Sequence, residues 1–232
     1  MSFSHKEPHI GNGSTFISDI VIGMSDGLTV PFALAAGVSS AVSDTHIVTT
    51  AGIAELVAGA ISMGLGGYLA GKTELEHYAA EKKNEYYEVE TIPEKEKQEV
   101  RDIFAGFGLS SEVQELAANE IIQDKDKWVD FMMQYELGLS EPDPRRATKS
   151  AANIGLSYVA GGIVPLLPYF FVDTPMQGLK ISAIVAICCL FVFGWFKSKA
   201  TGQPLLSGAV RVTVIGAIAA AAAFLVAKFF EA

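Results

Sequence analysis

A single charged segment interrupts an otherwise apolar chain of 232 residues. Half of all residues are hydrophobic and only 19% are charged, against roughly a quarter in a soluble domain. Residues 72–150 nevertheless hold 19 of the 26 acidic side chains and 11 of the 17 basic ones. A soluble globule would spread its charge over the whole surface. The pattern therefore indicates a membrane protein with a polar domain inserted into it.

Five stretches are long and apolar enough to cross a bilayer as helices, which takes about 20 residues each. They lie near residues 17–41, 47–71, 150–171, 178–197 and 205–230. We predict an all-α membrane protein with five transmembrane helices and a three-helix cytosolic domain between spans two and three. Residues 1–71 hold the N-terminal region and spans one and two. Residues 72–149 form the cytosolic insert, which continues the helix of span two, and residues 150–232 hold spans three to five.

The insert has its own helix signals. No proline occurs between residues 47 and 90, so span two is expected to continue into the cytosol as one helix. Thr91-Ile-Pro-Glu94 has the spacing of a capping box and predicts a helix that ends near residues 106–108. A second short helix is expected to start at Ser111, and a third to cover residues 126–137.

The lysines and arginines set the orientation, because cytosolic loops carry an excess of both. With the N-terminus in the cytosol, fifteen of these residues fall on the cytosolic side and only Lys180 and Lys228 on the other. The N-terminus and residues 72–149 are therefore predicted to be cytosolic, with the C-terminus on the opposite, lumenal face.

Composition and the absence of certain motifs argue against several functions. The sequence pI near 4.9 and the acidic insert argue against nucleic-acid binding, which needs a basic surface. Cys188 and Cys189 are adjacent within an apolar run and indicate neither a disulfide framework nor a zinc site. No catalytic triad and no phosphate-binding loop stands out, so we do not expect an enzyme or an ATP-driven pump.

Two carboxylates lie at membrane depth, where ionisable groups are expensive and mark a transport pathway by default. They are Asp26 in span one and Glu55 in span two. Met63 follows Glu55 at i+8, on the same helix face. Oxygen and thioether ligands suit a borderline divalent metal such as Fe²⁺. The alternative is that both acids satisfy internal hydrogen bonds and that Met63 fills a gap in packing.

Small residues are frequent on the same two spans, with Gly23 and Gly27 on span one and glycines from Gly59 onward on span two. Small residues four apart allow close approach of helices, and Pro31 is expected to kink span one. Such a pair suits a path through or between subunits, and equally a simple dimer interface.

Three helical segments of the insert, namely the extension of span two, the helix after residue 91 and the helix over residues 126–137, are each expected to present potential metal ligands on one face, because side chains three or four residues apart are neighbours on a helix. Oxygen and sulfur ligands together fit Fe²⁺ or Mn²⁺ better than Ca²⁺. The alternative for any single glutamate is a solvated helix face. The candidates are Glu81, Glu85, Glu88, Glu96, Glu99, Met132, Met133 and Glu136.

The segment Glu74-Leu-Glu-His77 has the Glu-x-x-His spacing of di-iron helix bundles. Those sites need two such motifs and further carboxylates. His5, His9 and His46 do not supply the second motif. A membrane di-iron oxidase is therefore a weak alternative.

The chain resembles the vacuolar iron transporters, most closely the plant members. The resemblance rests on the five spans, the acidic insert, Asp26 in Asp-Gly-Leu-Thr-Val-Pro-Phe, and Glu55 in Glu-Leu-Val-Ala-Gly-Ala-Ile-Ser-Met-Gly. It implies a homodimeric Fe²⁺/H⁺ antiporter of the vacuolar membrane that moves cytosolic iron into the vacuole. No tightly bound cofactor is implied, and Fe²⁺ is the cargo.

The resemblance also implies roles for individual residues. Asp26, Glu55 and Met63 would line the translocation path between the first two spans of both subunits. The insert would be a metal-binding domain that gathers ions, with ligands Glu85, Glu88, Glu96, Glu99, Met132, Met133 and Glu136.

Two other functions remain open from the residues themselves. Ligand type cannot separate Fe²⁺ from Mn²⁺, Co²⁺ or Zn²⁺, so a transporter of another divalent metal is the nearest competitor. The other is a membrane-anchored iron buffer or sensor, in which the spans serve only as an anchor. Asp26 and Glu55 argue against it, because an anchor needs no acid at membrane depth.

Overall fold

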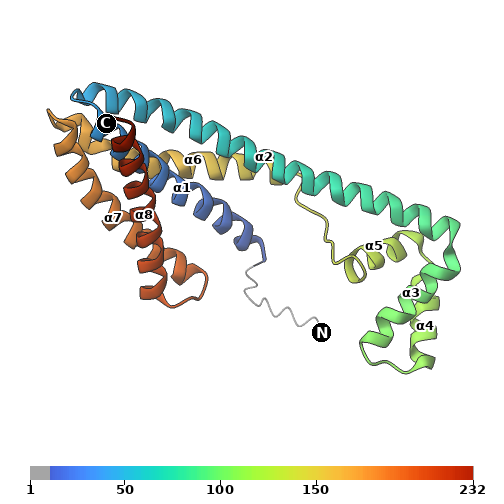
Figure 1. Ribbon diagram of the computed structural model, residues 1–232. Helices are drawn as coiled ribbons and strands as arrows, with labels where there is room; N and C mark the ends of the chain where they lie inside the picture. The colour runs from blue at the N-terminus through green and yellow to red at the C-terminus, as the bar shows by residue number, and fades with distance from the viewer. Residues whose placement is uncertain (1–10, 232) are drawn as a thin grey trace, which may run out of the picture. The chain divides into compact units, whose positions relative to one another are not determined.

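The computed structural model describes residues 11–231, and these form helices joined by short turns and by the longer irregular segment 136–145 (Figure 1). No strand occurs in this range, so the predicted all-α class is confirmed. The N-terminal ten residues, with their predicted cytosolic location, lie outside the described part. The elements are α1 Gly11–Ala41, α2 Thr45–Thr91, α3 Pro93–Gly106, α4 Ser111–Ile121, α5 Lys125–Tyr135, α6 Arg146–Leu166, the 3₁₀ helix η1 Leu167–Phe171, α7 Pro175–Ala200 and α8 Leu205–Glu231.

Within residues 11–231, five helical segments are long and apolar enough to cross a membrane, as the sequence predicted: α1, α2, α6 with η1, α7 and α8. The chain divides into two compact units. The spanning unit holds the chain up to Tyr68 and from Thr148 onward, and the insert unit is Leu69–Ala147. The helix α2 contributes to both. Its 47 residues make it about 70 Å long, roughly twice the hydrocarbon thickness of a bilayer.

Within the spanning unit, α6 packs closely against both α1 and α2. A methyl group added at Gly23 or Gly27 of α1 would meet the backbone carbonyls of Ile154 and Tyr158 in α6. A methyl group at Gly59 of α2 would meet the Tyr158 ring. The glycines that indicated close packing of spans one and two therefore accommodate the third span, because only a missing Cβ lets the backbones approach this closely.

The other three elements of the spanning unit complete the bundle. The helices α1, α7 and α8 contact one another, and η1 packs on α7. The Ser182 hydroxyl of α7 donates a hydrogen bond to the carbonyl of Pro165 in α6 at 2.6 Å. Pro165 lies in the last turn of α6, where the carbonyls have no N–H partner within the helix. The Ser182 hydroxyl supplies a donor for this carbonyl.

The insert unit has an apolar core of its own, centred on α5 and including Val100, Trp128, Val129, Met132 and Met133. The helices α3, α4 and α5 follow one another around it (Figure 1). Because long apolar side chains at one-turn spacing face the same side, α3 and α5 each bury one stripe and leave their charged residues outside or at the site described below.

Several helix boundaries differ from the sequence prediction by a few residues, among them the end of α5, which lies at Tyr135 and not at residue 137. The predicted capping box at Thr91 is wrong, because Thr91 belongs to α2 and its hydroxyl donates to the Tyr87 carbonyl at 2.8 Å. The helix α3 begins at Pro93 instead, since proline at the first helical position gives up only an N–H that would have no helical partner. The helix α5 starts one residue earlier than predicted, because Asp124 caps it by accepting the Asp126 and Lys127 N–H groups.

Candidate metal sites

Five glutamates converge in the insert unit. Glu85, Glu88 and Glu96 each place a carboxylate oxygen within 4.8 Å of the others, and Glu96, Glu99 and Glu136 do the same. The first two come from α2, the next two from α3, and Glu136 directly follows α5. Glu96 belongs to both groups and so lies at the centre of this glutamate cluster. Two or three carboxylates at this spacing can share one divalent cation.

Burial makes the glutamate cluster energetically unusual. The Glu96 side chain is 0% exposed and that of Glu85 3%. Both Glu96 oxygens and one Glu85 oxygen have no hydrogen-bond partner among the described residues. Lys95 lies 4.0 Å from Glu96 but donates to Glu99 at 2.8 Å, and it is itself 64% exposed. Buried carboxylates without partners are stable only if they are protonated or neutralised by a cation.

The pKa values of the cluster follow from this burial. Loss of solvation raises the pKa of Glu85 to about 7, and the negative charges of Glu136 and Glu96 add to the effect. The pKa of Glu96 also rises to about 7, again mainly through burial and then through Glu99 and Glu88. Burial raises the pKa of Glu136 in the same direction. Glu85 lies in the charged part of α2, beyond its apolar stretch. The metal-free cluster therefore holds protons near neutral pH.

Metal affinity of the cluster should fall steeply as the pH falls. Below pH 7, Glu85 and Glu96 must each release a proton before they bind a cation. Two such groups weaken binding by about 100-fold between pH 8 and pH 6. Calorimetric titration of the full chain with Co²⁺, which resists oxidation at pH 8, measures this. A change of less than about threefold over that range would contradict the raised pKa values.

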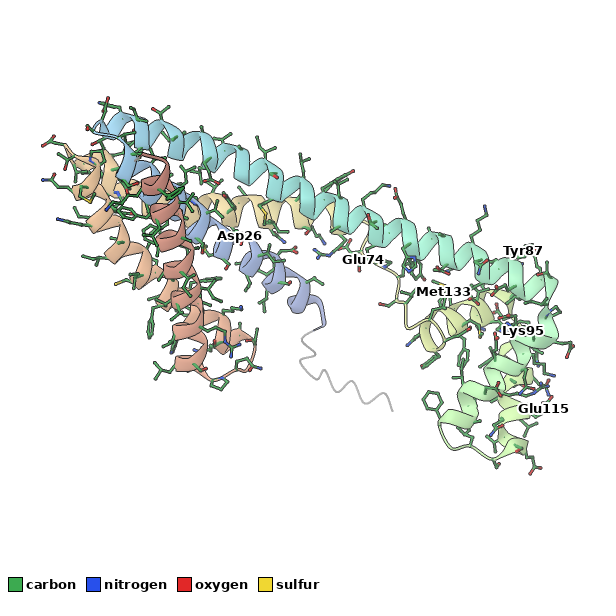
Figure 2. All side chains as sticks on the ribbon, viewed as in Figure 1. Asp26, Glu74, Tyr87, Lys95, Glu115 and Met133 are labelled. Carbon is green, nitrogen blue, oxygen red and sulfur yellow. The ribbon has the colours of Figure 1, made fainter. Side chains whose placement is uncertain are left out.

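The methionines predicted as ligands lie in the apolar core. Met132 and Met133 are 0% and 1% exposed and pack with Val100 and Trp128; Figure 2 labels Met133 on α5. Met132 is one turn before Glu136, whose N–H donates to the Met132 carbonyl at 2.9 Å. The methionines thus fix the end of α5 through packing. Their sulfur atoms as ligands remain a prediction.

Three further candidates of the insert do not join the cluster. His77 lies 3.6 Å from Glu81 one turn along α2, and Glu74 lies 3.8 Å from Arg146. None of the three belongs to either group of converging carboxylates. The two residues of the Glu-x-x-His motif therefore contact different partners, His77 with Glu81 and Glu74 with Arg146, which does not favour a di-iron site.

A second polar site lies inside the spanning unit. The Tyr158 hydroxyl of α6 donates a hydrogen bond to Glu55 of α2, and the other Glu55 oxygen is buried without a hydrogen-bond partner. Asp26 of α1, labelled in Figure 2, lies within electrostatic range of the same hydroxyl. Gly27, the residue after Asp26, packs against the Tyr158 backbone. Tyr158 thus binds one of the two predicted carboxylates and lies within electrostatic range of the other. No local sequence pattern marked it as a partner of either.

Met63 and Asp19 extend this site along the helices. Met63 is half-buried and lies eight residues beyond Glu55, about 12 Å along the helix axis. The two cannot hold one ion together and would act in succession. Asp19 is 2% exposed and accepts hydrogen bonds from Ser150 at 3.1 Å and Asn153 at 3.3 Å, both on α6. A polar residue inside the apolar third span, such as Asn153, is the sequence signal by which these hydrogen-bond partners of Asp19 could have been found.

Comparisons with known proteins agree with this architecture. A model of the VIT family matches residues 17–228. Vacuolar iron transporter 1 of Arabidopsis thaliana is 49% identical over 227 residues, covering 98% of this chain and 90% of the relative. Vacuolar iron transporter of Centaurea cyanus is 50% identical, covering 97% and 91%. Protein CCC1 of Saccharomyces cerevisiae is 42% identical, covering 91% and 68%. The chain belongs to the VIT family.

Proposed function

We propose that this protein carries cytosolic Fe²⁺ across the vacuolar membrane into the vacuole in exchange for protons. The observation that carries the proposal is Glu55, a carboxylate with one unsatisfied oxygen inside an apolar spanning helix. Ionisable groups at such positions mark ion pathways. Membership of the VIT family and the names of the similar plant proteins support iron as the cargo and the vacuole as the destination.

Capture of the metal is assigned to the insert unit. Its five converging glutamates hold protons near neutral pH when no metal is present. Fe²⁺ and protons compete for the same oxygens, so loading of the cluster releases protons. The cluster therefore concentrates metal from the cytosol, the side on which the positive-inside rule places residues 72–149.

Translocation is assigned to the spanning unit. Asp26, Glu55 and Met63 offer two oxygen positions and one sulfur position in succession. The Tyr158 hydroxyl holds one oxygen of Glu55 and leaves the other to accept either a proton or the metal. A carboxylate binds either a proton or the metal ion. When the vacuolar lumen is acidic, movement of the metal into the vacuole is therefore coupled to movement of protons out of it.

The proposed assembly is a homodimer in the membrane, with the C-terminus in the lumen. No resident cofactor is required, since the metal is the cargo. Mn²⁺, Co²⁺ and Zn²⁺ are expected to compete for the same ligands, because the affinity of such a site for divalent metals follows the Irving–Williams order and does not single out Fe²⁺. Preference for Fe²⁺ is therefore expected to come from metal supply as much as from the ligand set.

Proton coupling can be tested in liposomes that contain the purified protein and a pH-sensitive dye. Addition of Fe²⁺ outside, under reducing and anaerobic conditions, is expected to make the interior alkaline, because protons leave as metal enters. Protein-free liposomes report leakage. An interior that stays at constant pH while Fe²⁺ accumulates would overturn the antiport. Absence of accumulation with retained binding to the insert unit would favour the buffer or sensor.

A further inference from the structure

A polar cavity lies at the turn between α7 and α8, remote in sequence from both metal sites. It has a volume of about 170 Å³. Its lining includes the cationic residues Lys197 and Arg211, together with Ser207 and Gln203, whose hydroxyl and amide can donate hydrogen bonds. Thr201 also lines the cavity, but its hydroxyl donates to the Lys197 carbonyl at 3.0 Å. Two cations with neighbouring hydrogen-bond donors around a small cavity are the features of a phosphate site.

An apolar groove adjoins this cavity. It has a volume of about 470 Å³ and is lined by Ile17 and Val21 of α1 and by Ala200 at the end of α7. Lys197 and Thr201 line both hollows. The two hollows therefore adjoin at Lys197 and Thr201, one with a charged lining and the other with an apolar lining. A free phosphate would occupy only the charged end, whereas a phospholipid fits both.

The charges around the cavity have one sign. The helix α7 contains no acidic residue, and the only one in α8 is Glu231, at the end of α8 opposite to the cavity. The nearest acid of α1 along the groove is Asp19, and its carboxylate accepts hydrogen bonds from α6. Lys199 adds a third cation, held 5.5 Å from the centre of the Trp195 ring. Tryptophan and lysine side by side are typical of the membrane–water interface.

We propose that this end of the spanning unit binds an anionic phospholipid whose headgroup is a phosphate monoester. The headgroup occupies the cavity between Lys197 and Arg211, and one acyl chain occupies the groove against α1. A monoester carries up to two negative charges near neutral pH, which matches two cations better than the single charge of a diester. Basic pockets between spanning helices on the cytosolic side bind such headgroups.

The test is lipid binding by the full-length protein, measured by native mass spectrometry from detergent micelles. The probe is dioleoylphosphatidic acid, with dioleoylphosphatidylcholine as the lipid of identical chains. The double variant Lys197→Gln/Arg211→Gln is expected to bind the probe about 30-fold more weakly, about fivefold for each cation removed. The matched control Lys180→Gln/Lys228→Gln removes the same charge from the opposite ends of the same two helices and should leave binding unchanged.

Three results would overturn the proposal. Equal weakening in both double variants would show general attraction of an anionic lipid to a cationic protein. Equal binding of the two lipids to the unaltered protein would show that the acyl chains alone are recognised. Displacement of the probe by inorganic phosphate at the same concentration would show a site for free phosphate. All four cations are at least partly exposed, so the variants are expected to fold.

Discussion

Asp26→Asn is expected to reduce Fe²⁺-driven alkalinisation of the liposome interior by at least about 100-fold. Loss of groups that merely support a metal ligand costs 10–100-fold, and the loss of a ligand should cost more. Asparagine keeps the size of the side chain and one oxygen but cannot release a proton on metal binding. The variant therefore removes both the charge that attracts the ion and the proton that is exchanged for it.

The matched control is Asp173→Asn. Asp173 lies between η1 and α7 in the same unit and is exposed, so the same substitution there should leave transport unchanged. Binding of Co²⁺ to the insert unit should be equal in both variants, which separates loss of transport from loss of capture. Transport that persists undiminished in Asp26→Asn would remove Asp26 from the pathway and reduce it to a packing residue.

Glu96→Gln is expected to weaken metal binding by the glutamate cluster and, at the same time, to stabilise the metal-free insert. Glu96 is shared by both groups of carboxylates, so its loss affects every ion in the cluster, by about 100-fold. Its raised pKa of about 7 means that folding favours the protonated form. The contribution of the Glu96 carboxyl to the free energy of unfolding is fully present below its pKa in the unfolded chain, near 4.5. This contribution is lost as the pH rises through 7, the pKa in the folded protein.

Glutamine at position 96 avoids this loss of stability at high pH, because its side chain is neutral at every pH. The gain should be up to about 3 kcal/mol at pH 8 and less than about 1 kcal/mol at pH 5. Thermal unfolding of the insert can be followed by Trp128 fluorescence in a Trp195→Phe background, since the chain has only two tryptophans. Glu120→Gln, at an exposed position of α4, is the control. Equal stability changes at pH 5 and pH 8 would contradict this account.

Much of the architecture was predictable from the sequence, because the relevant signals are local. A stretch of about 20 apolar residues is a membrane helix whatever its neighbours are, and five such stretches were identified correctly. The continuation of α2 beyond its apolar part followed from the absence of proline. The helix starts were less secure. At Thr91 two local signals competed, and the proline at the first position of α3 determined the boundary.

The partners of the acidic residues depended on the tertiary structure. Periodicity placed Glu81, Glu85 and Glu88 on one face of α2, yet only the last two meet Glu96, because the docking of α3 and α5 covers one part of that face and leaves Glu81 beside His77. Glu55 was recognisable as an acid at membrane depth. Its hydrogen bond from Tyr158 was not, since 103 residues separate the two.

The sequence by itself therefore determined the class of the protein, the five spans, the charged insert and the residue types that can hold a metal. Hydropathy and charge act on each segment separately, so these properties can be read along the chain. The tertiary structure decided which carboxylates meet, which of them are buried without partners, and which tyrosine joins Glu55. These depend on distances between segments far apart in sequence, and such distances are set only when the helices pack.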